Sequence, residues 1–318
     1  MLWLLVAVFA PLSAAAENPF LPAQDPAPLL AAIAREQPAF TPPVGVTGII
    51  VPHHLLAADL IARGYWAASA GHYTRIILVS PDHFHKVQKA FGTTREDLKT
   101  VFGTVASDRR SVDTLIAHPD LVQVLPGVDY EHGLMAEAPF IRHFFPDAKI
   151  IPLLGSINAT AADWRAMVEV LKPLVTPDTL VVQSTDFSHY RPLPEAIARD
   201  QETIAAIDTG DPEAIVPLLQ PSHLDSKAAG YIQLALQREV FGSHPVILAN
   251  ANSADYGTGP GSTRAMWWRR SSRTRPRRRR SPTPTRRLRC SAATCCSAVI
   301  CCPRCTMRPR GRPCAMRW

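Results

Sequence analysis

The hydrophobic pattern of the chain alternates between short, wholly apolar runs and longer stretches with helical spacing. Such runs are typical of strands buried on both faces, and such stretches are typical of helices with one buried side. The pattern predicts strands at residues 46–52, 75–80, 149–154, 180–184 and 245–250. It predicts helices at residues 55–70, 108–118, 161–174, 193–207 and 226–241. This alternation predicts an α/β sheet covered on both faces.

The composition divides the chain near Gly257. No Asp or Glu follows Asp255, whereas 17 of the 34 Lys and Arg residues do. The part before Gly257 therefore carries 27 acidic and 17 basic side chains, a net charge of −10, although the whole chain is +7. An acidic body argues against a nucleic-acid partner. All seven cysteines lie from Cys290 onward, so the body offers no thiolate as nucleophile or metal ligand.

The N-terminus resembles a signal peptide. An apolar run is followed by small residues at Ala14 and Ala16, which predicts cleavage after residue 16. The run is too short for a stable membrane span. No Lys or Arg precedes it, so a buried first element is the alternative. We expect a periplasmic or secreted protein if the signal peptide is real, and a cytoplasmic one otherwise. Residues 17–44, rich in Pro and Ala, are expected to be a leader.

Residues 258–318 have no acidic residue and no hydrophobic period. Such a segment cannot offset its ordering entropy by burial. Its Arg, Pro, Ser and Cys content resembles a GC-rich gene read in a shifted frame. A disordered basic tail and a genuine metal or nucleic-acid module are the alternatives. We expect residues 268–318 to form no compact core and no tetrahedral cysteine site, and the domain at residues 45–257 to lack its last strand.

Four polar clusters follow or flank the apolar strands. Their histidines and acids are His53, His54, Asp82, His83, His85, Glu131, His132, Glu137, Asp186 and His189. Ligands of open α/β sheets bind just beyond the carboxyl ends of the strands, and imidazole with carboxylate is a common donor set for divalent transition metals. One such histidine is more often a cap or a core residue, and Asp186 could cap a turn. Four clusters together favour a shared metal pocket.

These clusters resemble motifs of the Memo family, named in bacteria AmmeMemoRadiSam system protein B. Residues 184–190, Ser-Thr-Asp-Phe-Ser-His-Tyr, resemble that family's Ser-Ser-Asp-Phe-Ser-His-Tyr. Residues 80–83, Ser-Pro-Asp-His, resemble its Gly-Pro-Asn-His, and residues 131–140 resemble its Glu-His-Ser-x-Glu…Pro-Phe. The resemblance spans residues 45–257. It implies a single domain with a mixed, mostly parallel sheet flanked by helices, related in fold to the class III extradiol dioxygenases.

The resemblance also implies a set of metal ligands. His53 and His83 match the family's metal-binding histidines. Asp225 stands where animal members have a Cys ligand, with His223 two residues before it. Two histidines and one carboxylate suit Fe(II), with copper or zinc as alternatives. Asp82, in place of the family's Asn, is expected to add negative charge beside the metal.

The same resemblance implies catalytic residues. His189 resembles the acid/base histidine of the dioxygenases, and His132 and Asp186 are expected to line the same pocket. One interpretation is a non-haem Fe(II) oxidoreductase or dioxygenase acting on a small molecule. Another is a non-catalytic metal, redox or peptide-binding partner in an AmmeMemoRadiSam-type system, beside a radical-SAM protein and an Ammecr-type protein. Hydrolysis by Zn(II)-activated water also remains open.

Overall fold

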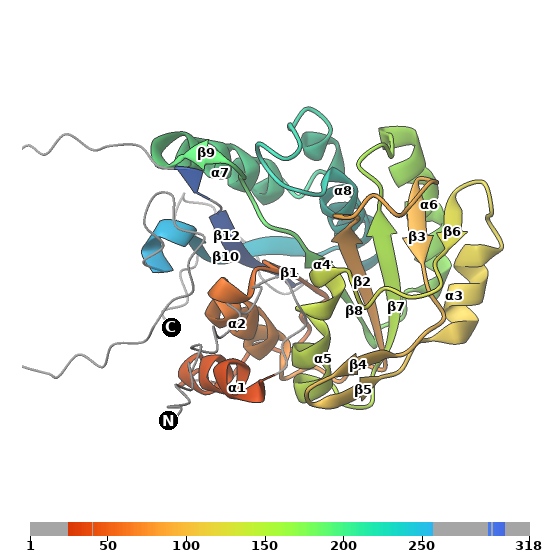
Figure 1. Cartoon of the computed structure of the whole chain (residues 1–318), viewed down its shortest axis with the longest axis horizontal. Coiled ribbons are helices and arrows are strands. Elements are labelled where there is room, and N and C mark those ends of the chain that lie inside the picture. The colour runs from red at the N-terminus through yellow and green to blue at the C-terminus, as the bar shows by residue number, and fades with distance from the viewer. Residues whose placement is uncertain (1–24, 40, 257–291, 294, 303–318) are drawn as a thin grey trace, which may run out of the picture.

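An eight-stranded sheet organises the protein (Figure 1). The structure is a computed structural model, and it describes residues 25–39, 41–256, 292–293 and 295–302. The strand order in the sheet is β10-β12-β1-β8-β2-β7-β3-β6. Its strands are β1 (Gly48–Val51), β2 (Arg75–Pro81), β3 (Phe91–Thr93), β6 (Val122–Val124), β7 (Lys149–Gly155), β8 (Thr179–Ser184), β10 (His244–Asn252) and β12 (Cys295–Cys302). Two small ribbons pair β4 (Leu98–Thr100) with β5 (Gly103–Val105), and β9 (Arg191–Pro192) with β11 (Ala292–Ala293).

The sheet is mixed but mostly parallel, as expected. β1, β8, β2 and β7 form a continuous parallel block, and β3 pairs with β6 in parallel. β12 runs antiparallel to both its neighbours, and β3 runs antiparallel to β7. Strands from the whole length of the chain thus build one α/β domain, so the predicted fold class is confirmed.

Helices cover both faces of the sheet (Figure 1). The α-helices are α1 (Pro26–Arg35), α2 (Ala58–Ala68), α3 (Arg109–Ile116), α4 (His132–Met135), α5 (Ala138–Phe144), α6 (Ala161–Leu171), α7 (Leu193–Asp208) and α8 (Lys227–Leu236). Short 3-10 turns lie at η1 (Leu55–Ala57), η2 (Lys172–Leu174), η3 (Pro212–Ile215) and η5 (Ser253–Tyr256), and a π-helical turn lies at η4 (Gln237–Phe241). Among the described residues, no helix is long and apolar enough to cross a bilayer.

Side chains alternate between the two faces along each central strand. Ile49 and Val51 of β1 pack into one core with α1, α2 and α5, and Ile50 packs into the other core with α3, α6 and α8. All three side chains are completely buried. A strand buried on both faces must be apolar at successive positions, which is why residues 46–52 carry the pattern of a buried strand.

Helix α1 corrects the expected boundary of the domain. It lies inside the stretch predicted as a leader, begins at an Asp25 N-cap and buries Leu29 and Ile33 in the core. Trp66 of α2 donates its indole N–H to the carbonyl of Ile33 at 2.8 Å. The packed domain therefore starts before Gly45. The predicted signal peptide lies outside the described residues.

Strand β12 corrects the expectation for the tail. Residues 295–302 pair with β1 on one side and with β10 on the other, so the sheet does not lack a strand at this position. The segment contains Val299 and Ile300, whose β-branched side chains favour strands. Its backbone can hydrogen-bond to the strands on both sides, and these bonds stabilise the segment. The composition of the tail as a whole does not reveal this stabilisation. The predictions for residues 257–291 and 303–318, and for the tail's cysteine side chains, lie outside what the structure describes.

Candidate metal centre

The candidate centre lies at the carboxyl edge of the parallel block. His53 follows β1, His83 follows β2 and Asp186 follows β8. Because these strands are adjacent and parallel, their carboxyl ends meet at one edge. Asp225 reaches the same place from the loop before α8, where its backbone N–H donates to the carbonyl of Asp186 at 3.1 Å. The fold thus brings together residues that are up to 172 positions apart in the chain, from His53 to Asp225.

The three predicted ligands surround a common point. Asp225 Oδ2 lies 3.0 Å from His53 Nε2 and 3.6 Å from His83 Nε2. His53 and Asp225 are buried, and His83 is about one-fifth exposed, at 21% of its side chain. An ion placed between the three atoms would meet two imidazole nitrogens and one carboxylate oxygen, which is the donor set that the sequence predicts.

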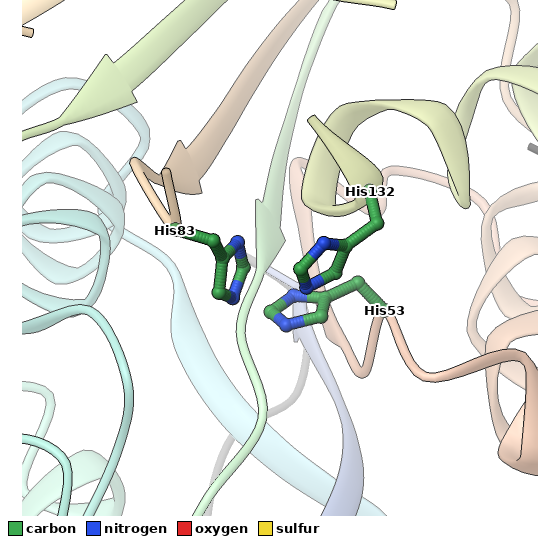
Figure 2. Close-up of side chains that lie close together, drawn as sticks. All are labelled: His53, His83 and His132. Carbon is green, nitrogen blue, oxygen red and sulfur yellow. The ribbon is translucent and has the colours of Figure 1, made fainter. Parts of the chain in front are cut away.

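His132 offers another nitrogen close by (Figure 2). Ligand atoms of His53, His83 and His132 lie within 4.8 Å of one another, and so do those of His53, Asp186 and Asp225. The rings of His53 and His83 stand at 84° with centroids 4.7 Å apart, so their nitrogens can converge. The ring of His132 lies against that of His83 at 3.8 Å and 32°. The pocket therefore offers two overlapping donor sets around His53, one with His83 and His132 and one with Asp186 and Asp225.

Hydrogen bonds fix which nitrogen of His53 faces the centre. Ser184 Oγ donates to the carbonyl of Gly133. Because its single proton is used there, it accepts from His53 Nδ1, 3.2 Å away. The chain of bonds places a ring proton on Nδ1 and leaves Nε2 facing Asp225, where its lone pair can bind an ion once Nε2 is deprotonated.

Glu131 does the same for His83. Its Oε1 accepts from His83 Nδ1 at 2.6 Å and from the backbone N–H of Gly133 at 3.0 Å. Its Oε2 accepts from the backbone N–H of His83 at 3.0 Å. This completely buried carboxylate therefore holds both the ring and the backbone of a predicted ligand. Carboxylate–histidine–metal arrangements of this kind orient the ring and raise its basicity.

The carboxylates also hold protons on the two imidazoles. Burial lowers the pKa of His83, but Asp225 and Glu131 outweigh it and raise that pKa to about 10. Burial likewise lowers the pKa of His53, and Asp186 and Asp225 raise it further than burial lowers it. Burial opposes ionisation of Asp225, yet the two histidines bring the pKa of its carboxyl well below the usual range. In the metal-free protein, protons occupy the place of a cation.

We expect metal binding to release protons at pH 7. A ligand imidazole must be neutral, whereas the pKa of about 10 keeps His83 protonated at this pH. Each ion bound should displace at least one proton, so the apparent affinity should rise roughly tenfold per pH unit for each proton released. Calorimetric titrations in buffers of different ionisation enthalpy measure the number of protons. No release at pH 7 would contradict this assignment.

Asp225 itself fits a cation. Both of its carboxylate oxygens are buried, and neither makes a hydrogen bond of regular geometry within the described part of the chain. A buried carboxylate without such bonds is costly unless a positive charge compensates it. The protonated imidazoles supply that charge in the metal-free protein, and a divalent ion between Asp225 and the two histidines would supply it once the rings are deprotonated.

His189 and Asp186 complete the pocket. His189 Nδ1 lies 2.7 Å from the carbonyl of Phe187, and since a carbonyl only accepts, the nitrogen donates. Nε2 is then left 3.8 Å from Asp186 Oδ2. Asp186 Oδ1 accepts from the backbone N–H of His53 at 3.1 Å. Burial, followed by the neighbouring His83 and His53, lowers the pKa of His132 to about 2, so this ring is neutral at pH 7.

Three polar residues near the centre have other tasks. Asp82 accepts from the backbone N–H groups of Lys86 and Val87 at 3.1 and 2.8 Å, so it holds the loop that carries His83. His54 Nδ1 caps the first turn of η1. His223 uses Nδ1 to accept a backbone N–H and pairs Nε2 with Glu202 at 2.7 Å. The charge of Asp82 is thus engaged in backbone contacts. The sequence alone assigns no role to Glu131 or Ser184, although both stand in the motifs at residues 131–140 and 184–190.

Glu137 adds a buried acid beside the centre. Both carboxylate oxygens are buried without a hydrogen bond of regular geometry among the described residues, beside the hydroxyl of Tyr65. Burial raises the pKa of this carboxyl well above its usual value; the hydrogen bond with Tyr65 opposes this shift, and the charge of Asp186 adds to it. The pKa of this carboxyl is higher in the folded protein than in the unfolded chain, where it is near 4.5. Its contribution to the free energy of unfolding is therefore fully present below pH 4.5 and is lost as pH rises toward the folded pKa.

We therefore expect Glu137→Gln to stabilise the protein increasingly as pH rises. The variant has no ionisable group at this position. Between pH 5 and pH 8, its free energy of unfolding should therefore increase relative to that of the wild type, by up to roughly 1.4 kcal/mol per pH unit. Urea denaturation at several pH values measures this difference. A difference that does not change with pH would show that Glu137 ionises normally.

The fold and the site define an α/β protein with a group of histidine and aspartate side chains that can hold a metal ion at the edge of its sheet. The Memo-like protein family matches residues 25–256, so the chain belongs to this family and the resemblance is confirmed. A MEMO1 family protein of Saccharolobus islandicus is 26% identical over 220 residues, covering 65% of this chain and 76% of that protein. One of Ignicoccus hospitalis is 22% identical over 218 residues, with the same coverage. A crystal structure of an uncharacterized Escherichia coli K12 protein aligns with a TM-score of 0.43 and 17% identity, covering 65% of this chain and 94% of that one.

Proposed function

We propose that the protein binds one divalent transition metal ion on His53, His83 and Asp225 and uses it as a non-haem Fe(II)-type centre. The observation that carries the proposal is Asp225 Oδ2, buried 3.0 and 3.6 Å from two imidazole nitrogens that are oriented toward it. When bound there, Fe(II) supplies a Lewis-acidic centre with positions open to substrate and O2. Copper and zinc are the other ions that this donor set accepts.

The residues around the ion suit proton transfer to or from a small molecule. His189 has its Nδ1–H fixed on the carbonyl of Phe187, so Nε2 is free to accept a proton. Asp186 lies beside that nitrogen and stabilises the cation that forms. His132, neutral and part-buried, presents a polar ring to the same space. Burial of these groups strengthens every charge interaction among them.

The test is metal analysis of protein purified without oxygen, followed by oxygen uptake on a panel of catechols and other small aromatic molecules. One Fe(II) per chain and substrate-dependent uptake support the proposal. Binding of one metal without uptake on any substrate would overturn the catalytic part. That result would favour the alternative, a metal or redox partner protein of an AmmeMemoRadiSam-type system.

His189→Ala separates binding from chemistry. We expect the variant to keep one metal per chain, because His189 is not among the three ligands, and to lose oxygen uptake by roughly 10²- to 10⁴-fold, the usual contribution of an acid/base group. Metal analysis and uptake rates on the same sample measure both. A loss of metal would make His189 a ligand.

A further inference from the structure

A second buried carboxylate, Asp200, lies behind the pocket. It belongs to α7 and is completely buried. Its Oδ1 accepts from the backbone N–H of Ser188 at 3.2 Å, and its Oδ2 accepts from the side-chain amide of Asn250 on β10 at 3.0 Å. Burying a carboxylate is expensive unless hydrogen bonds compensate. Oδ1 thus accepts a hydrogen bond from the loop between Asp186 and His189.

That loop is held at several points. Asp225 donates its backbone N–H to the carbonyl of Asp186 at 3.1 Å, and His189 donates its own to the carbonyl of Pro221 at 3.2 Å. Between these two anchors, Ser188 contacts α7 twice: its Oγ donates to the carbonyl of Ala196 at 3.2 Å, and its backbone N–H, the group that belongs to the peptide unit, donates to Asp200. Hydrogen bonds to a carboxylate are roughly twice as strong as neutral ones.

The bond to Ser188 bears directly on the His189 ring. His189 Nδ1 donates to the carbonyl of Phe187, which belongs to the same peptide unit as the Ser188 N–H. A peptide unit is planar, so fixing its N–H on Asp200 also fixes the direction of its carbonyl. The carbonyl in turn selects the tautomer of His189 in which Nε2 faces the pocket.

We propose that Asp200 is a positioning residue, which sets the tautomer and orientation of His189 by holding the Phe187–Ser188 peptide unit. This rests on the proposed function only in taking His189 as the acid/base group. A merely structural role would tie α7 to β10 through Asn250 and leave the ring of His189 unaffected.

The test measures the ring nitrogens of His189 by NMR in the Zn(II)-loaded full chain, at a pH where the ring is neutral. The wild type should show a single tautomer with the proton on Nδ1. Asp200→Ala should show a mixture of the two tautomers, and the amide of Ser188 should exchange about tenfold faster, the effect of losing one hydrogen bond. Asn250→Ala, which removes the other partner of the same carboxylate, should keep the wild-type tautomer.

A conservative variant keeps the test decisive if Asp200→Ala does not fold. Asp200→Asn has the same shape and still offers one oxygen to Ser188, but as a neutral acceptor, so amide exchange at Ser188 should rise several-fold while metal stoichiometry stays unchanged. An unchanged His189 tautomer and unchanged exchange at Ser188 in the Asp200 variants, or equal effects of Asp200→Ala and Asn250→Ala, would overturn the proposal. If the wild type binds no metal, the proposed function fails, yet the tautomer of His189 can be measured in the metal-free protein.

Discussion

Asp225→Ala is expected to abolish stoichiometric metal binding. The substitution removes the carboxylate that lies within 3.6 Å of both predicted imidazole ligands and leaves two of the three predicted ligands. Loss of a residue that merely supports a ligand costs about 10- to 100-fold in metal affinity, so loss of the ligand itself should cost more. Competition with a chelator of known affinity measures the change.

Two variants control this result. Asp120→Ala removes an exposed aspartate and should leave affinity unchanged. Asp225→Cys puts a thiolate where animal members of the family carry one, so it should restore binding but shift preference from Fe(II) toward copper or zinc. Wild-type affinity in Asp225→Ala would exclude Asp225 as a ligand.

Glu131→Ala is the second prediction with a large effect. The variant leaves His83 Nδ1 and two backbone N–H groups without their acceptor. We expect metal affinity to fall about 10- to 100-fold and stability to fall by about 1–3 kcal/mol. Metal titration and urea denaturation measure the two losses.

Glu131→Gln is the matched control. The amide oxygen of Gln can accept in place of one carboxylate oxygen, whereas its NH2 group faces another donor and cannot accept. The metal affinity of this variant should therefore lie between those of Glu131→Ala and the wild type. Full affinity in both variants would mean that His83 needs no carboxylate to face the metal.

The sequence predicts the parallel block, and the side chains that meet at its edge, for a physical reason. Strands buried on both faces must be apolar throughout, so β1, β2, β7 and β8 are visible as runs, and their carboxyl ends must share an edge. That rule suffices to bring His53, His83 and Asp186 together. Asp225 comes from a loop, and its place could be inferred only through the resemblance to the Memo family.

The rest of the fold depends on contacts that periodicity does not show. β3 and β6 are three residues long, too short for a pattern, and α1 lies in a stretch whose Pro and Ala content is typical of a leader. β12 pairs with β1 and β10, although the overall composition of the tail argues against folding. Glu131 and Asp200 act through hydrogen bonds across 48 and 12 positions, which a linear sequence does not specify.

The central claim is that one divalent ion binds between His53, His83 and Asp225. The most direct test is a crystal structure of the Fe(II)-loaded protein with anomalous data at the iron edge. We predict a single strong peak within coordination distance, about 2.0–2.2 Å, of both Nε2 atoms and a carboxylate oxygen of Asp225. A loaded crystal with no peak there, or with iron on His132 and away from Asp225, would contradict the account.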